Sequence, residues 1–183
     1  FNKGITDANR QKIIAGIAEV FDIGADQPTD FEGIPVLNNL NATFYAFAND
    51  ERRGEHDIDN LWHVFEAELA LAADDNEETR KAFVEAFDTT VIQFTLGWKL
   101  TMGLYWARPY NFISLDSRNR WFMADVAKAG TAIADIMPKE KDSPVHDGDR
   151  YLAICDTIKS KLGSEECSYA DFPSLTAAAF VES

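Results

Sequence analysis

The residues best suited to chemistry fall in one stretch of the chain, WARPYNFISLDSRNRWF, at positions 106–122. Aromatic side chains flank a proline there, and Asp116, Arg118 and Arg120 follow within five residues. Guanidinium groups in such a cluster can hold the phosphate or carboxylate of a ligand, or they can pair with neighbouring acids of the same chain. The spacing leaves both interpretations open: a contact site for a ligand or a neighbouring domain, and a helix cap with internal salt bridges.

The same stretch predicts a break between two helices. Pro109 cannot continue the helix before it, and it pushes the residue ahead of it toward an extended conformation. Asp116 is placed to accept hydrogen bonds from the next backbone N–H groups and so to cap a new helix. We therefore take five residues as candidate contacts for a ligand or partner, with Lys99 nearby: Arg108, Asp116, Arg118, Asn119 and Arg120.

The motifs of the common catalytic sites are absent from the sequence. It contains no GxxxxGK[ST] phosphate-binding loop and no GxGxxG, HExxH or GxSxG. The sequence predicts no catalytic residue and no nucleotide-hydrolysing site in this chain.

Three histidines allow a remote alternative, an HD-like metal-dependent hydrolase. Its ligand order is formally met by His63, then His146 with Asp147, then Asp171. The His146–Asp147 pair, however, lies between Pro144 and Gly148, in a predicted loop rather than on a buried helix, so no metal is expected.

The two cysteines do not indicate a metal site either. Cys155 and Cys167 are surrounded by no CxxC or Cys/His pattern. Cys155 falls on the apolar stripe of a predicted helix, which favours a buried free thiol over a nucleophile.

Charge limits the partners of the chain. Its 31 acidic and 17 basic residues give a net charge of −14, and a field of that sign repels a phosphate backbone. We therefore do not expect this chain to be the main DNA-binding element. It shows no signal peptide and no apolar run near the length of a membrane span, so a cytoplasmic location without membrane contact is expected.

Helical periodicity dominates the 183 residues, and no alternating pattern is long enough for a sheet. The sequence predicts an all-α, single-domain bundle of about seven or eight helices over residues 1–183. The chain begins at Phe1 and ends in an apolar helical pattern, so we expect an N-terminal fragment of a longer protein. Apolar stripes with helical spacing are found at residues 13–21, 58–72, 83–94, 126–137 and 151–162, and residues 93–106 are apolar almost all round.

The block W-x-R-P-Y-N-F-I-S-L-D-S-R-N-R-W at residues 106–121 resembles a helical segment upstream of the AAA+ motor in McrB-type proteins. These are the nucleotide-hydrolysing subunits of modification-dependent (type IV) DNA restriction systems. IPVLNNLNATFYAF, residues 34–47, and DFPSLTAAAF, residues 171–180, resemble the start and the end of the same region. The resemblance spans about residues 30–181.

The resemblance implies a non-catalytic accessory domain that serves interaction, scaffolding or target recognition. Its partners would be the motor domain of its own protein and a nuclease subunit. GTP or ATP with Mg²⁺ would bind only in a downstream motor domain, so this chain would need no cofactor. DNA is a possible partner of the full protein, and the net charge argues against direct binding by this domain.

The alternative is a free-standing helical module that binds a ligand or a protein. Six aromatic side chains are the candidates for the lining of its pocket: Trp98, Tyr105, Trp106, Tyr110, Phe112 and Trp121.

Overall fold

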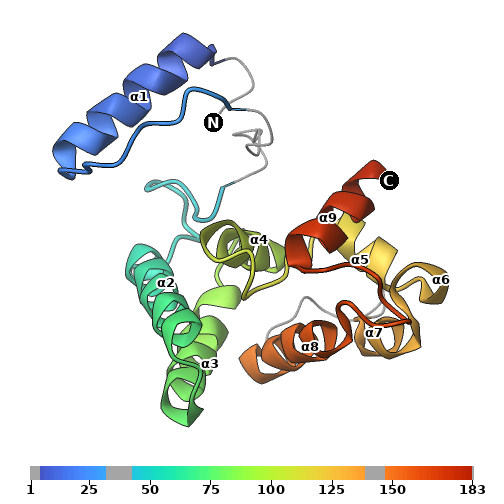
Figure 1. Cartoon of the computed structure of the whole chain (residues 1–183). Coiled ribbons are helices and arrows are strands. Elements are labelled where there is room, and N and C mark those ends of the chain that lie inside the picture. Colours follow the sequence, from blue (N-terminus) through green and yellow to red (C-terminus); the bar gives the residue numbers. More distant parts are fainter. Residues whose placement is uncertain (1–4, 32–42, 139–146, 183) are drawn as a thin grey trace. The chain divides into compact units, whose positions relative to one another are not determined.

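The computed structural model describes residues 5–31, 43–138 and 147–182. These residues form nine α-helices joined by turns and irregular segments, with no strand among them, and the all-α prediction is confirmed. The chain divides into two compact units, Phe1–Thr43 and Phe44–Ser183 (Figure 1).

The first unit contains α1 (Asp7–Val20) and the irregular segment after it. The Thr6 hydroxyl accepts a hydrogen bond from the backbone N–H of Asn9 and begins the helix. Arg10 places its guanidinium 5.7 Å from the ring centroid of Phe31. The side chains of the predicted stripe stay largely exposed, among them Val20 and Phe21 at 77% and 71%.

Most of the stretch at residues 34–47 lies outside the described residues. Its described part, residues 43–47, is not helical.

The second unit contains the other helices, which pack mainly against neighbours in the chain. The hairpin of α2 and α3 packs through α3 on α8, α8 packs on α7, and α5 packs on α9 (Figure 1). Their bounds are α2 Asp57–Ala73, α3 Glu77–Val91, α4 Trp98–Ala107, α5 Ser117–Met123, α6 Val126–Ala129, α7 Thr131–Ile136, α8 Gly148–Lys161 and α9 Phe172–Val181.

Local capping chemistry fixes where several of these helices begin. The Asn76 side chain accepts hydrogen bonds from the N–H groups of Glu78 and Thr79, and the Thr79 hydroxyl accepts one from Asn76 N–H. This reciprocal arrangement satisfies the free donors at the start of α3. The apolar stripe predicted at residues 58–72 lies within α2.

Two predicted helices are shorter or divided in the structure. Residues 126–137 form α6 and α7 rather than one helix, because Gly130 has φ of 85° and breaks the run. A Cβ at Gly130 would lie 2.9 Å from the backbone oxygen of Glu166, so the close approach of two segments also requires glycine there. The apolar run from Gln93 becomes helical only at Trp98, after Thr95 and Gly97 at positive φ.

A stack of four aromatic rings forms the centre of the core. Phe83 lies 5.2 Å from Phe112, and Phe87 lies 5.1 Å from Tyr151, measured between ring centroids. The Tyr151 hydroxyl donates a 2.9 Å hydrogen bond to the backbone oxygen of Ile113. The 108–116 turn is thereby fastened to α8 at the point where α3 and α8 meet.

The apolar face of α2 differs from the predicted one. The apolar stripe predicted at residues 58–72 includes Trp62 and Phe65, and the structure leaves these two side chains 60% and 37% exposed, packed edge to face on each other. The positions buried toward α3 are instead Val64, Glu68 and Leu71. This prediction was wrong because a 17-residue helix with apolar residues on two sides does not reveal which side meets its neighbour.

No helix in the described part of the chain has the length and apolar character needed to cross a bilayer.

Candidate functional site

The turn between α4 and α5 is held by side chains of both helices. Arg108 ends α4, and the backbone N–H of Leu115 donates a 2.9 Å hydrogen bond to the hydroxyl of Thr101 within α4. The Ser114 hydroxyl donates to a carboxylate oxygen of Asp116 at 2.9 Å. The start of α5 is therefore fixed relative to α4.

Asp116 and Asn119 build the first turn of α5. The Asp116 carboxylate accepts hydrogen bonds from Arg118 N–H at 2.9 Å, from Asn119 N–H at 3.1 Å and from the Asn119 side-chain amide at 2.8 Å. Asn119 is only 2% exposed. The hydrogen bonds of both side chains therefore stabilise the start of α5, as predicted for a helix cap.

Arg118 and Arg120 lie against aromatic rings. The guanidinium carbon of Arg118 is 4.7 Å from the ring centroid of Phe180 on α9, and that of Arg120 is 3.9 Å from the ring centroid of Trp98 on α4. Arg118 is exposed, whereas Arg120 is half-buried. A guanidinium that stacks on a ring keeps the N–H donors at its edge directed away from that ring, so Arg118 can still bind an anion.

A further cation–aromatic pair lies beside Arg118 on the surface of α5. Trp121 lies one turn after Arg118 on α5, and the Lys128 ammonium sits 3.8 Å from its ring centroid. Lys128 also forms a 3.0 Å ion pair with Glu182, which connects α6 to the end of α9. We call this surface the α5–α9 face and define it by Arg118, Trp121, Lys128, Phe180 and Glu182.

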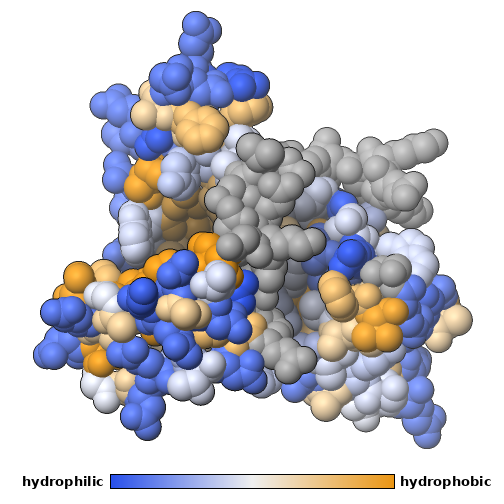
Figure 2. Space-filling model, turned by 90° about the horizontal axis from the view of Figure 1, so that it is seen from above, coloured by the Kyte–Doolittle hydropathy of each residue, from blue (hydrophilic) through white to orange (hydrophobic). Residues whose placement is uncertain are grey.

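Two aromatic side chains of the α5–α9 face are largely exposed. Trp121 and Phe180 are 52% and 66% exposed. Exposed hydrophobic residues, orange in Figure 2, are scattered among hydrophilic ones over the surface drawn there, so they are not restricted to the α5–α9 face. Exposed aromatic rings beside charged groups are typical of interaction surfaces.

The charge of the segment around this face differs from that of the rest of the chain. Residues 89–134 carry five Lys or Arg and two Asp, a net charge of +3, whereas the whole chain carries −14. All other residues together therefore carry −17. The α4–α5 segment is a locally positive region in a strongly acidic chain.

Arg108 lies apart from this face, near a buried carboxyl group. Its side chain is exposed and donates a hydrogen bond to the backbone oxygen of Ala107. Glu68 of α2 is only 1% exposed, and its Oε1 atom has no hydrogen-bond partner. Burial raises the pKa of Glu68 to about 8, and the positive charge of Arg108 opposes this rise.

The sequence analysis missed Glu68. It lies four residues after Val64 and three before Leu71, which both face the core, so helical spacing places it on the buried side. That spacing marks Glu68 only once the buried side of α2 is known, and the sequence alone does not decide which side that is.

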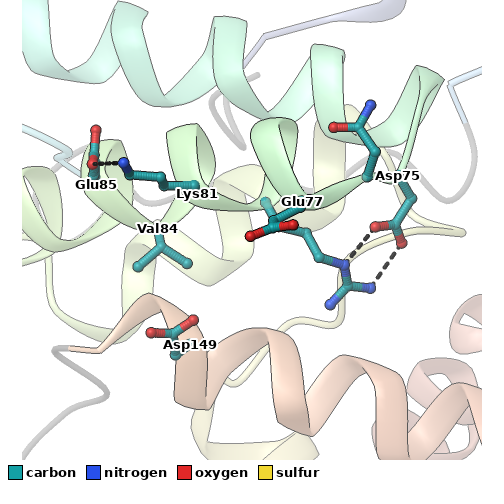
Figure 3. A pocket seen from close by; sticks show the side chains of 8 residues that line it. Asp75, Glu77, Lys81, Val84, Glu85 and Asp149 are labelled. Carbon is teal, nitrogen blue, oxygen red and sulfur yellow. Dashed lines mark hydrogen bonds and ion pairs between the residues drawn. The ribbon is translucent and has the colours of Figure 1, made fainter.

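A groove of about 730 Å³ lies on another side of the second unit, between α3 and the start of α8 (Figure 3). Its two basic side chains are already paired, Arg80 with Asp75 and Asp156, and Lys81 with Glu85. An anionic ligand would therefore meet carboxylates on most sides, and the groove offers no free charge for it. Its lining consists of Asp75, Asn76, Glu77, Arg80, Lys81, Val84, Glu85 and Asp149.

The aromatic side chains expected to line a pocket lie in different surroundings. Phe112 belongs to the buried ring stack, Trp106 packs edge to face on Phe44, and Tyr110 is 67% exposed. Trp98 is covered on one side by Arg120.

The residues of the HD-like alternative are separated or used elsewhere. His63 is exposed on α2, Asp147 caps α8 through Arg150 N–H, and Asp171 caps α9 through Ser174 N–H. His146 lies outside the described residues. Within the ranges that the structure describes, no three His, Cys, Asp or Glu side chains are grouped to hold a metal.

Both cysteines are buried free thiols, as predicted for Cys155. Burial raises the pKa of Cys155 to about 11, which disfavours the nucleophilic thiolate at neutral pH.

A family model described as "Domain of unknown function (DUF8425)" matches residues 1–182. The chain belongs to this family. No curated protein and no solved structure matches it. The family description states no activity.

Proposed function

We propose that this chain is a non-catalytic accessory domain of a McrB-like AAA+ restriction protein and that it contacts its partner through the α5–α9 face. The observation that supports this proposal is that side chains of the LDSRNRW block at residues 115–121 have two different roles. Asp116 and Asn119 turn inward and build the helix start, whereas Arg118 and Trp121 project outward on successive turns.

The composition of this surface supports a contact role. Trp and Arg are the residue types most enriched among those that dominate binding energy at protein interfaces. Arg118 lies on Phe180, and Trp121 is bordered by Lys128, so the rings and cations are held in place before a partner binds. A preorganised surface loses less side-chain entropy on binding.

The partner we propose is the motor domain of the same protein or its nuclease subunit. A protein partner needs only local complementarity, which the segment at residues 89–134 provides with its net charge of +3. A nucleic acid would also feel the −17 of the remaining chain, which opposes approach. GTP or ATP with Mg²⁺ belongs in this proposal to the motor domain, and no residue of this chain is assigned to it.

Two experiments test the proposal. The complete reading frame that encodes this chain should contain a GxxxxGK[ST] motif after the position of Ser183. In that full protein, deletion of residues 44–183 should abolish restriction of modified DNA and leave the rate of nucleotide hydrolysis by the motor within about threefold of the wild type.

Two results would contradict the proposal. A reading frame without a nucleotide-binding motif would favour the free-standing binding module instead. Full restriction activity after the deletion would show that the domain has no accessory role.

A further inference from the structure

We propose that the α5–α9 face binds a short peptide segment of a partner protein that combines one or two carboxylates with aromatic or large aliphatic side chains. This inference rests on the contact role of that face in the proposed function, and it does not depend on the identity of the motor.

The cations on the face limit how much negative charge it can accept. Lys128 is already paired with Glu182 at 3.0 Å and is largely covered, with 21% of its side chain exposed. Arg118 is exposed and contacts the ring of Phe180. A guanidinium in this position can bind one carboxylate through two parallel N–H···O hydrogen bonds.

Apolar side chains are exposed on this face and on the helices that adjoin it. Trp121 and Phe180 are 52% and 66% exposed, and Val126 and Val181 on the adjoining helices are 54% and 82% exposed. Covering this area with apolar side chains removes it from water, which is the main favourable contribution to association. A ligand that carries only charge would leave it exposed.

A phosphate backbone fits this surface less well than a peptide does. Glu182 lies within the face, and the chain outside residues 89–134 carries −17. A nucleic acid brings a regular row of negative charges, which the net charge of the chain repels. A peptide can place its carboxylate beside Arg118 and its apolar side chains on Trp121 and Phe180.

The test uses the chain labelled with ¹⁵N, because its four tryptophans give four indole N–H signals. Trp121 reports on the α5–α9 face, and Trp62 is a matched internal control, since it is 60% exposed on α2 at the other end of the second unit (Figure 1). Trp→Phe variants assign the signals.

Four probes are titrated into the labelled chain. They are a twelve-residue peptide that alternates glutamate with leucine and tryptophan, an acidic peptide with serine in place of its apolar residues, an apolar peptide with glutamine in place of its glutamates, and a twelve-nucleotide single strand of DNA. We expect the first peptide to shift the Trp121 signal and leave the Trp62 signal in place. The other three should bind at least about tenfold more weakly, because each lacks one of the two required contacts or carries excess charge.

Charge-reversed variants locate the interaction. Arg118→Glu should weaken binding of the first peptide at least about tenfold, whereas Lys81→Glu, the same charge change on exposed α3, should change it less than about twofold. Arg118→Gln serves as a milder variant, and unshifted Trp98 and Trp106 signals verify that each variant is folded.

The inference is overturned by any of three outcomes: no shift of Trp121 with the first peptide, an equal shift with the apolar peptide, or tighter binding of the DNA strand. If these occur while the deletion in the full protein still abolishes restriction, the accessory role stands and only the peptide inference fails. If the peptide binds but the reading frame lacks a motor, the proposed function fails and the peptide inference stands.

Discussion

The guanidinium of Arg118 lies 4.7 Å from the ring centroid of Phe180, 62 positions further along the chain. This contact joins α5, which carries the most distinctive block of the sequence, to α9 near the end of the chain. Because Arg118 and Phe180 are both exposed, their contact adds little to the core and shapes a surface instead.

Replacement of Phe180 should therefore have only a small effect on the free energy of unfolding. We expect Phe180→Ser to lower the free energy of unfolding by less than about 1 kcal/mol, because the ring is largely solvated and an exposed cation–π contact is weak. Phe172→Ala on the same helix removes a ring that is 1% exposed, and it should cost about 3–5 kcal/mol. Urea denaturation measures both. Equal losses would show that Phe180 is a core residue in solution.

Asp116 should be the most sensitive position of the block for folding. Asp116→Ala removes the cap of α5 and leaves the buried Asn119 amide without its acceptor, so we expect a loss of about 2–3 kcal/mol. Asp125→Ala is the matched control, since Asp125 caps the four-residue α6 through one hydrogen bond to Ala127 N–H. Asp125→Ala should lower the free energy of unfolding by about 1 kcal/mol or less. Thermal unfolding with equal or reversed losses would contradict the assigned role of Asp116.

Glu68 should make the stability of the protein depend on pH. Its pKa is about 8 in the folded state against 4.5 for the ordinary group, so the folded state retains a proton that the unfolded state loses. The contribution of protonated Glu68 to the free energy of unfolding is complete below pH 4.5. It decreases as the pH rises from 4.5 to 8, and above pH 8 it has been lost. Glu68→Gln keeps the shape without the charge. We expect it to match the wild type near pH 4 and to be more stable by about 2–4 kcal/mol at pH 8.5.

The control for that experiment is Glu66→Gln, on the exposed side of α2. Its unfolding free energy should follow that of the wild type within about 0.5 kcal/mol at each pH, as expected for an exposed substitution. A constant difference between Glu68→Gln and the wild type from pH 4 to 8.5 would show that Glu68 does not titrate in this range.

Tyr151 should stabilise the folded state through its hydroxyl as well as through its ring. Tyr151→Phe preserves the aromatic stack and removes the hydrogen bond to the buried backbone oxygen of Ile113, so we expect a loss of about 1–3 kcal/mol. The change should also loosen the turn that precedes α5. Hydrogen exchange at the amides of residues 110–115 checks this, and unchanged protection would argue against Tyr151 as the anchor of the turn.

The features predicted well from sequence are those decided within a few residues. Asp116 caps the helix that follows it because an N-cap side chain accepts hydrogen bonds from backbone groups two or three positions ahead. Such contacts can be read directly from spacing.

The features that were missed depend on residues far apart in the chain. The helix break at Gly130 lies where the backbone of Glu166 comes close to it. The aromatic ring that Arg118 contacts belongs to Phe180. Burial of Glu68 depends on which side of α2 meets α3, which helical spacing alone does not decide. The candidate arginines were thus named from sequence, whereas the surface that they form with α9 was visible only in the structure.

The most direct test of the proposed function is a restriction assay of the full protein that carries Arg118→Glu together with Trp121→Ser. The matched control carries Lys81→Glu together with Trp62→Ser, which makes the same charge reversal and the same loss of an exposed indole on α3 and α2. If the proposed function holds, the first pair abolishes restriction of modified DNA while the proposed motor domain still hydrolyses nucleotide at a rate within about threefold of the wild type, and the control pair changes neither. Normal restriction by the α5–α9 pair, in a protein that remains folded, would contradict the contact role of this face.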